Sequence, residues 1–403
     1  MNQADIVHLT FKPPFIRGSY NRLVGDLLNK LPELRQAAIC YWDEPLPEGV
    51  EPDSRVILVD EENLSWKQRA TLLTPERIRG RWFNGVTTRQ SLVYLWGVIQ
   101  AITQIQPKLI ICHDNYKFGM LLRKHIGWPC RLALTQHGLS YHLPVAQAMQ
   151  LYSLKSFDTV WTMTRTSYRF DRNRMAAYEP VVHLLPSMVD VNLFRPANDL
   201  ERREARAQWG LPEDKLIVLS LSRLVAQKGA HILLQSWPEV LRHCPNAFFW
   251  IVGDGNVEYE RYLKSLITSL NLSDSVRLQG AAQPEIIFSC YRAADVFAFP
   301  TLVSEGQSFA LLEAMASGLA CIASYQDSMA DSFSPEMLHL VQDANISGSF
   351  VAPITSLLND QAGRDQMGQK ARQHVVQNHS MEKLLPRFEQ VFRQQLKLAG
   401  EIH

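Results

Sequence analysis

The amino-acid sequence predicts an α/β protein of two doubly wound parallel-sheet domains that face a central cleft. Short β-branched or apolar runs alternate with helix-length amphipathic stretches, which is typical of parallel strands joined by crossover helices. This alternation is interrupted once, by a polar and charged interval from Asn198 to Lys215, and then restarts. The 403 residues also exceed one usual domain of roughly 100–200 residues.

The predicted elements follow from the spacing of the apolar residues. Strands are expected in the first half at 6–10, 37–42, 55–60, 108–113, 131–137, 159–163 and 181–185, and in the second half at 216–222, 247–253, 276–280, 295–300, 319–324 and 338–342. Apolar spacing near the helical period of about 3.6 predicts helices over 21–31 and 90–105. Residues 324–333 are polar and predict a loop or a short helix, and the amphipathic tail over 381–398 predicts a helix kinked at Pro386.

The same patterns divide the chain into four segments. We expect a first domain over residues 1–197, a linker over 198–214, a second domain over 215–380, and a terminal helix over 381–403 that crosses back to the first domain.

The composition is that of a soluble globular protein. Hydrophobic residues make up 46% and charged residues 20% of the chain, and no apolar run approaches the roughly 18 residues of a membrane span. The start lacks the basic and apolar pattern of a signal peptide, so we expect a cytoplasmic protein. Six scattered cysteines without a CxxC or Cys/His cluster predict buried, reduced thiols.

The net charge of +1 conceals an uneven distribution. Residues 1–200 hold 23 Lys and Arg against 18 Asp and Glu, whereas residues 201–403 hold 18 against 22. The basic excess is densest between Lys108 and Arg174. A solvated basic face is the simpler interpretation, and contact with anionic lipid or a phosphorylated acceptor is the more specific one. The excess is too small for nucleic acid, and no recognition motif accompanies it.

Two cations follow the first strand of the second half. Arg223 and Lys228 stand five positions apart in the loop between the strand over 216–222 and the next helix. A loop at a strand's carboxyl end, before a helix amino terminus, suits a diphosphate. Solvated surface charges are the alternative.

The next two strand ends carry weaker signals. Gly253 ends the strand over 247–253 and begins a GxG, which by itself indicates little more than a tight turn. Gln279, Gly280 and Ala281 lie at the end of the strand over 276–280, where backbone groups could meet a nucleotide base or form an ordinary turn.

Two acids flank the start of a helix in the run SEGQSFALLEAMASGLA. Glu305 precedes the helix, which is expected to begin near Gln307 or Ser308, and Glu313 lies on its second turn with seven residues between the two acids. Carboxylates accept hydrogen bonds, so they suit the hydroxyl groups of a sugar or ribose. Helix capping by Glu305 and a solvated Glu313 form the alternative.

These residues together resemble a known family. The runs LSLSRLVAQKG, IVGDG, VRLQG, ADVFAFPT and SEGQSFALLEAMASGLACIAS resemble the carboxyl half of retaining glycosyltransferases of family 4, the glycogen-synthase-like group with the GT-B fold of two Rossmann-like domains. The resemblance is close from Val218 to Ser324 and looser before Lys108. In the first half it rests on RLALTQHGLSY, FDTVWTMTRTSYRF and VVHLLPSMVDVNLFRPA.

The resemblance implies a role for each matching residue. Arg223 and Lys228 would hold the donor diphosphate, Glu313 the ribose hydroxyls, and Glu305 the donor sugar. His137 would touch the transferred sugar near the reacting centre. The backbone of Gly306, Gln307, Ser308 and Phe309 would receive the phosphates and the sugar, so residues 1–197 would form the acceptor side and 215–380 the nucleotide-sugar side.

Three positions depart from the family pattern. FKPPFIRGSY has Gly18 alone where the family often has a Gly-Gly loop, and its prolines put the shape of that loop in question. Ser308 stands in EGQS where EGFG is frequent, and PSMVD stands where PNGVD is commoner.

The expected activity is metal-independent hexosyl transfer without a bound cofactor. We find no D-x-D motif and no nucleophile–base pair in the sequence. The resemblance implies a UDP- or GDP-linked donor, retention of configuration, and a saccharide or lipid-linked acceptor in surface polysaccharide or glycolipid synthesis, with peripheral contact at the inner membrane face. A nucleotide-sugar epimerase and a catalytically silent nucleotide-sugar binding protein remain open as alternatives.

Overall fold

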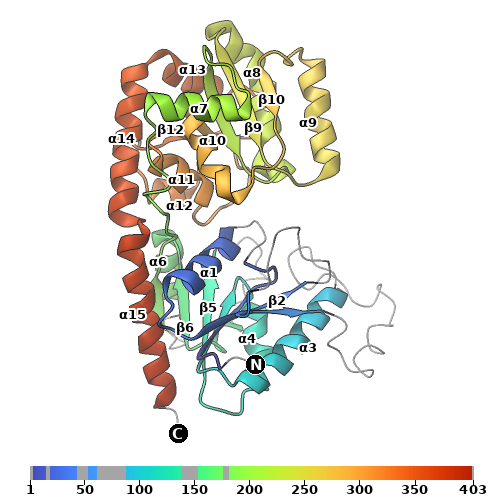
Figure 1. The fold of residues 1–403 in the computed structure, drawn as a ribbon, viewed down its shortest axis with the longest axis vertical. Helices are drawn as coiled ribbons and strands as arrows, with labels where there is room; N and C mark the ends of the chain where they lie inside the picture. The colour runs from blue at the N-terminus through green and yellow to red at the C-terminus, as the bar shows by residue number, and fades with distance from the viewer. Residues whose placement is uncertain are drawn as a thin grey trace. The chain divides into compact units, whose positions relative to one another are not determined.

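The chain forms two compact units, each built around one parallel sheet (Figure 1). The computed structural model describes residues 3–14, 19–42, 53–60, 88–137, 153–175 and 181–401. Unit 1 comprises Met1–Met163, Ser167–Leu185 and Leu385–His403, and unit 2 comprises Thr164–Thr166 and Pro186–Leu384.

Unit 1 contains a seven-stranded parallel sheet in the order β3-β2-β1-β4-β5-β6-β7. Its strands are β1 Ile6–Leu9, β2 Gln36–Tyr41, β3 Val56–Val59, β4 Leu109–His113, β5 Arg131–Gln136, β6 Thr159–Thr162 and β7 Val181–Leu184. Its helices are α1 Ser19–Lys30, α3 Thr88–Ile105, α4 Tyr116–Arg123, most of α6 Arg165–Met175 and most of α15 Met381–Gly400.

The two faces of this sheet pack against different helices, because successive side chains of a strand point to opposite faces. Val7 and Leu9 of β1 belong to a core cluster that also contains side chains of α3 and α4. On the other face, Ala38 and Cys40 of β2 pack against α1. On β6, the ring of Trp161 stacks on Phe392 of α15 with 5.4 Å between centroids.

Unit 2 contains a six-stranded parallel sheet in the order β10-β9-β8-β11-β12-β13. Its strands are β8 Leu216–Leu221, β9 Ala247–Val252, β10 Val276–Leu278, β11 Val296–Phe299, β12 Ala320–Ser324 and β13 His339–Val341. Its helices are α7 Asp199–Trp209, α8 Ala230–His243, α9 Val257–Ser269, α10 Ile287–Ala293, α11 Phe309–Ala316, α12 Asp327–Ala330, α13 Val351–Asn359 and α14 Gln361–Asn378, with short 3-10 turns at Ala226–Lys228 and Pro284–Ile286.

Helices cover both faces of this second sheet. Phe297 and Phe299 of β11 join a cluster with side chains of α7, α10, α11 and α14, whereas Val296 and Ala298 join a cluster with side chains of α8, α9 and α13. The strands β9 and β11 are apolar along their whole length because both of their faces are buried.

Each strand predicted from the sequence has its counterpart in the structure, and the helices expected over 21–31 and 90–105 correspond to α1 and α3. The segment 324–333 contains the short helix α12. The tail forms α15, a single helical element that continues through Pro386.

The interval 198–214 differs from the expected linker, since it lies within unit 2 and contains α7. Asn198 and Glu201 form a reciprocal capping box that begins this helix. The charged residues that suggested a linker include Arg202 and Arg206, which form ion pairs with Asp295 at 2.5 and 2.7 Å. In the described part of the chain, no helix combines the length and apolar character needed to span a bilayer.

Candidate active site

The candidate site of unit 2 lies where the strand order of its sheet reverses. β8 and β11 are neighbours in the sheet, but the chain leaves β8 toward β9 and reaches β11 only after β10. Doubly wound sheets bind ligands beyond the carboxyl ends of their strands at such a switch point. We call the loops that follow β8, β11 and β12 the edge site.

An ion pair joins the two sides of this switch point. Lys228, after β8, pairs through Nζ with Oε1 of Glu305, after β11. The two side chains are 14% and 19% exposed, so the pair is largely removed from water. The Thr301 hydroxyl donates to the same Glu305 oxygen at 3.1 Å, and Lys228 Nζ lies 5.3 Å from the Phe299 ring centroid. Two residues that the sequence assigned to different parts of a ligand therefore contact each other directly.

The loop that presents Lys228 requires a glycine next to it. Gly229 adopts φ +73, and a Cβ at this position would lie 1.9 Å from the carbonyl oxygen of Pro300. The backbone at Pro300, directly after β11, is therefore in close contact with Gly229 at the start of α8. Leu302 also donates its N–H to the Gln227 carbonyl at 2.7 Å, which ties the two loops together.

The loop after β12 holds Glu305 from the other side. Gln326 accepts from the Glu305 N–H at 2.6 Å and donates to the Val303 carbonyl at 2.5 Å. The Ser328 hydroxyl donates to the Glu305 carbonyl at 2.9 Å. These two supporting residues were missed in the sequence, where residues 324–333 read only as a polar stretch.

Helix α11 begins at the end of the loop that follows β11, four residues after Glu305. Ser308 is the N-cap residue, and its hydroxyl accepts from the Leu311 N–H at 3.4 Å. The cap is therefore serine, and Glu305 is engaged with Lys228 instead. Gly306 and Phe309 are buried, and Gln307 accepts from the Ser187 N–H at 2.7 Å.

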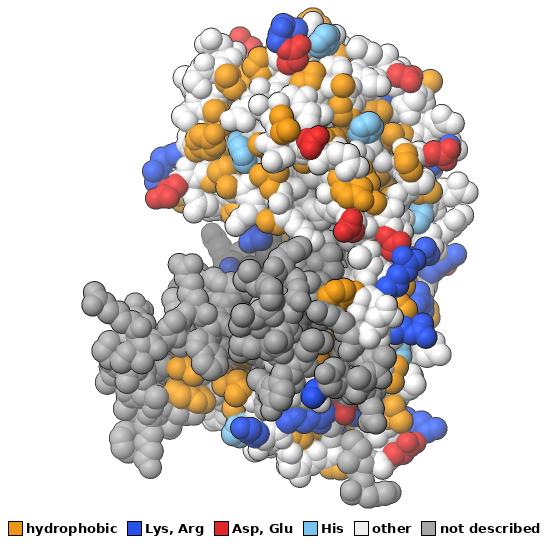
Figure 2. All heavy atoms as spheres, turned by 180° about the vertical axis from the view of Figure 1, so that it is seen from behind, with side chains coloured by type: hydrophobic (Ala, Val, Ile, Leu, Met, Phe, Trp, Pro, Cys, Tyr) orange, Lys and Arg blue, Asp and Glu red, His pale blue; other side chains and the backbone are white. Residues whose placement is uncertain are grey.

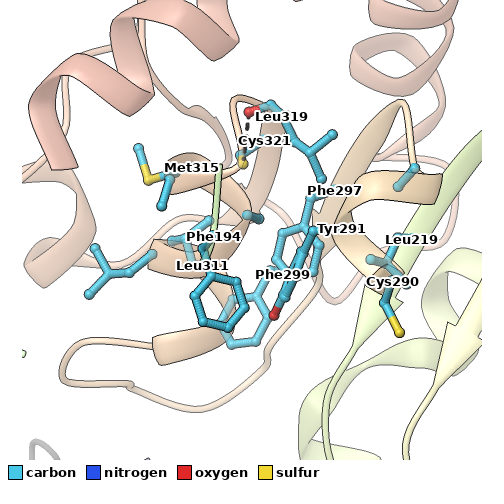
Figure 3. Packing of buried hydrophobic residues seen from close by; sticks show 14 of the residues in the cluster. Phe194, Leu219, Cys290, Tyr291, Phe297, Phe299, Leu311, Met315, Leu319 and Cys321 are labelled. Carbon is cyan, nitrogen blue, oxygen red and sulfur yellow. Dashed lines mark hydrogen bonds between the residues drawn. The ribbon is translucent and has the colours of Figure 1, made fainter. Parts of the chain in front are cut away.

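Glu313 is buried on the second turn of α11. It is 3% exposed, and its Oε2 accepts a hydrogen bond from the Tyr291 hydroxyl at 2.7 Å. Figure 3 shows the Tyr291 ring within the aromatic core, where it makes an edge contact with Phe194 at 5.7 Å between centroids. Burial, together with the Glu313 carboxylate, raises the pKa of the neighbouring Cys290 thiol to about 12. A solvated Glu313 is thus excluded.

The loops after β9 and β10 complete this edge of the sheet. Gly253 adopts φ +146, where a Cβ would lie 1.8 Å from the Ser222 carbonyl oxygen, and its N–H donates to the Gly280 carbonyl at 2.8 Å. Gln279 Oε1 accepts from the Trp250 indole at 3.2 Å. Gly280 and Ala281 lie next along the chain, half-buried and exposed respectively. The Arg223 side chain, after β8, is exposed.

His137 lies in unit 1, at the carboxyl end of β5. Its backbone N–H donates to Asp114 Oδ1 at 2.6 Å, and Asp114 itself has a positive φ of 53 after β4. Burial lowers the pKa of His137, while the Asp114 carboxylate opposes the shift. Gly18, predicted for the donor loop, lies outside the described residues.

Two further histidines, which the sequence interpretation missed, form a row with His137. His113 Nδ1 is 2.9 Å from His137 Nε2, and His8 Nδ1 is 3.1 Å from His113 Nε2. The three rings are stacked, with centroids 5.2 and 5.4 Å apart. We call these residues the histidine row. The available signal was a histidine at or near the end of each of the runs IVHLT, LIICH and LALTQH.

All six cysteines are free and buried, as the sequence predicts. Among the described residues, no group of three or more His, Cys, Asp or Glu side chains has the arrangement of a metal site.

Comparison with solved structures shows the fold of the chain. It is similar to a sucrose-phosphate synthase from Thermosynechococcus elongatus, with a TM-score of 0.76 at 21% identity over 98% of this chain and 100% of the other. It is also similar to the Anabaena protein HepE in complex with UDP, with a TM-score of 0.71 at 17% identity over 97% and 100%. With its two parallel-sheet units, the chain has the GT-B fold.

Sequence comparison identifies the family of unit 2. Residues 201–374 match the family model described as glycosyl transferases group 1. The chain is 31% identical over 209 residues to a GDP-mannose-dependent monoacylated alpha-(1-6)-phosphatidylinositol monomannoside mannosyltransferase from Corynebacterium glutamicum, covering 50% of this chain and 54% of that protein. A corresponding mannosyltransferase of Mycolicibacterium smegmatis is 30% identical over 52% and 56%.

The match covers about half the length of these curated relatives. Unit 2 is therefore a group 1 glycosyltransferase domain, in agreement with the resemblance carried by its motifs.

We predict that Gly229→Ala destabilises unit 2 more than Gly280→Ala. Both glycines have positive φ, which costs roughly 1–2 kcal/mol for a residue with a Cβ. At Gly280 nothing lies within 4 Å of the added atom, whereas at Gly229 it meets Pro300. Thermal unfolding midpoints of the two variants measure the difference, and equal shifts would contradict the close approach of the two loops.

We predict that the protein loses stability as the pH falls from 6.5 to 5. Burial lowers the pKa of His8 and of His379 from about 6.5 to about 4, and it also lowers the pKa of His113 well below its usual value. Between pH 6.5 and about 4 the unfolded chain binds protons that the folded chain excludes, so the free energy of unfolding falls by about 1.4 kcal/mol per pH unit for each such histidine.

Thermal unfolding between pH 7 and pH 5 measures this slope in the wild type and in His379→Gln, which should be less sensitive. His243→Gln is the matched control because that side chain is 57% exposed. A midpoint that stays constant or rises on acidification would contradict the neutral state of the buried rings.

Proposed function

We propose that the protein transfers a hexosyl-type sugar from a nucleotide-diphosphate sugar to a saccharide or lipid-linked acceptor, with retention of configuration. The observation that carries the proposal is the Lys228–Glu305 pair at the switch point of a group 1 glycosyltransferase domain. A cation and a carboxylate in contact suit a ligand with an anionic diphosphate and a hydroxyl-rich sugar side by side.

The proposed diphosphate site uses Lys228, Arg223 and the first N–H groups of α11. An ammonium group has three donors, so Lys228 can keep its bond to Glu305 and still donate to phosphate oxygens. The amino terminus of α11 adds the positive end of a helix dipole. Arg223 is exposed on the same loop as Lys228 and supplies a second, planar cation.

The proposed nucleoside and sugar contacts lie on either side of the diphosphate. Tyr291 orients the Glu313 carboxylate, which would accept the ribose hydroxyls. Glu305 would accept a hydroxyl of the donor sugar. Its position is fixed by Lys228, Thr301 and the loop after β12.

The proposed reaction breaks the bond between the anomeric carbon and the diphosphate oxygen and forms a bond from that carbon to the acceptor oxygen. The acceptor hydroxyl would pass its proton to the departing diphosphate oxygen on the same face of the sugar. Negative charge grows on the diphosphate, where Lys228, Arg223 and the α11 amides stabilise it without a metal ion.

For the acceptor, we propose a lipid-linked or otherwise anionic saccharide at the cytoplasmic face of a membrane. The free cysteines fit a reducing compartment. Arg165, Arg169 and Arg172 are exposed and spaced along one face of α6. Figure 2 shows Lys and Arg side chains gathered at one side of the face that it draws. The mannosyltransferase relatives are named for phosphatidylinositol monomannoside as acceptor, which agrees with this proposal.

We predict that one of the nucleoside diphosphates UDP, GDP and ADP, or the monophosphate CMP, raises the thermal unfolding midpoint of the wild type. Ligands that bind the native state stabilise it. Lys228→Ala should weaken this binding roughly 10- to 100-fold, the effect of one charged hydrogen bond. Lys264→Ala is the matched control because that lysine is 63% exposed and pairs with Glu260 on α9.

Glu305→Gln separates binding from transfer in the same panel. In this variant the nucleotide should still raise the unfolding midpoint as in the wild type. The rate at which the donor is cleaved to free nucleotide should fall about 10²- to 10³-fold, as for loss of one transition-state contact. If no nucleotide stabilises the wild type, the proposed donor site is wrong. If a nucleotide binds but no donor sugar is transferred to any saccharide, the protein is a nucleotide-sugar binding protein and not a transferase.

We predict that the protein sediments with vesicles containing phosphatidylglycerol and not with pure phosphatidylcholine vesicles. The double variant Arg169→Gln/Arg172→Gln should bind about 30-fold more weakly, since each cation near an anionic surface contributes about 1 kcal/mol. The double variant Arg203→Gln/Lys264→Gln removes the same charge from α7 and α9 and should bind as the wild type does. Equal sedimentation with both lipids would contradict the basic contact.

A further inference from the structure

Both backbone groups of Glu305 bond to side chains of the segment that follows β12. The Glu305 N–H donates to Gln326 Oε1 at 2.6 Å, and the Glu305 carbonyl accepts from the Ser328 hydroxyl at 2.9 Å. The Glu305 carboxylate bonds elsewhere, to Lys228 after β8 and to Thr301 after β11. All of these residues belong to unit 2. The backbone and the side chain of Glu305 are therefore held by two different sets of residues.

The Gln326 amide bridges two backbone groups of the loop after β11. Its Nε2 donates to the Val303 carbonyl at 2.5 Å, while its Oε1 accepts from the Glu305 N–H. Only one orientation of the amide satisfies both groups, because the carbonyl needs a donor and the N–H needs an acceptor. In a parallel ladder, one residue bonds in the same way to the neighbouring strand at two positions that are two residues apart. Gln326 thus uses its side chain to continue the pairing of β11 with β12 beyond the strand ends.

The segment that carries Gln326 and Ser328 is anchored in the core of unit 2. The Gln326 carbonyl accepts from the N–H groups of Met329 and Ala330 at 3.0 and 2.9 Å, where α12 begins. The Met329 side chain is buried in the cluster that also contains side chains of α11 and α14, and Ser328 is buried as well. A movement of the Glu305 backbone therefore has to break hydrogen bonds to a segment that the core fixes.

Lys228 is the cation for which Glu305 and a bound diphosphate would compete. Both are anionic, and each is stabilised by contact with an ammonium group. Diphosphate oxygens that reach Lys228 would draw its ammonium group toward themselves and would repel the carboxylate that is bonded to it. On a loosely held loop, the Glu305 carboxylate would be displaced at the moment when the donor binds.

We propose that Gln326 and Ser328 are positioning residues that hold the Glu305 backbone, so that the Glu305 carboxylate keeps its place at the donor sugar when the diphosphate binds Lys228. The hold on the backbone follows from the hydrogen bonds alone, and its use in sugar transfer rests on the proposed function. In this role Gln326 and Ser328 act on the sugar only through Glu305.

The hold on Glu305 is tested first, by the thermal unfolding midpoint of the full-length protein. Lys228→Met leaves the largely buried Glu305 carboxylate without its cation, which destabilises the folded state if the carboxylate cannot move into water. Gln326→Met or Ser328→Ala frees the loop, so in either background Lys228→Met should lower the midpoint less than it does in the wild type. An equal or larger fall in both backgrounds would overturn the proposal.

Ser236→Ala is the matched control background. Ser236 is buried on α8 in the same unit, and its hydroxyl accepts from the Gly348 N–H at 2.9 Å, so this variant also removes a buried hydrogen bond to the backbone. Lys228→Met should lower the midpoint in this background as much as in the wild type. Gln326 and Ser328 are changed one at a time, so that the comparison stands if one of the two variants fails to fold.

Kinetics then separate the positioning role from the proposed function. With UDP-glucose, GDP-mannose or ADP-glucose, whichever the wild type cleaves, Gln326→Met and Ser328→Ala should each lower kcat about 10-fold, the effect of one hydrogen bond. The KM for that donor and the stabilisation by its nucleotide should stay as in the wild type, and Ser236→Ala should leave kcat unchanged. An unchanged kcat, or a raised KM alone, would overturn the positioning role. If the wild type cleaves none of these donors, the proposed function is wrong, whereas the unfolding midpoints still decide whether the Glu305 backbone is held.

Discussion

The reversal of strand order at the middle of each sheet is the constraint on which both candidate sites depend. Crossover connections are right-handed, so a sheet can place helices on both faces only if the chain winds outward in two directions from a central pair of strands. In unit 2 that pair is β8 and β11. Their exit loops turn away from each other into helices on opposite faces, and Lys228 and Glu305 meet between them.

The strand order also reverses in the sheet of unit 1, but different side chains meet there. Its central pair is β1 and β4, and the residues that meet across it are His8 and His113. An ion pair at one switch point and a row of neutral rings at the other differ in what they offer a ligand. The first presents a cation and a carboxylate, and the second links Gln36, His8, His113 and His137 by hydrogen bonds.

Burial is what gives these polar groups fixed roles. A polar side chain in the interior must be hydrogen-bonded, because leaving it unsatisfied costs about 1–3 kcal/mol. Glu313 is therefore held by Tyr291, and Gln36 is held by two carbonyls of α1 and the turn that follows it. The aromatic cluster of Phe194, Tyr291 and Phe297 in Figure 3 keeps water away from this part of α11. Such groups are preorganised, which is the property that a site for charge development needs.

The sequence by itself determined the strands, the two-unit α/β architecture, and the edge of the sheet at which Lys228 and Glu305 lie. These follow from local period and from the rule that parallel strands end at one edge. Tertiary structure alone decided that Lys228 binds Glu305, that Gln326 and Ser328 support them, and that three histidines form a row. These contacts join residues far apart in the chain, and their existence depends on strand register and on which face each side chain occupies, neither of which local sequence encodes.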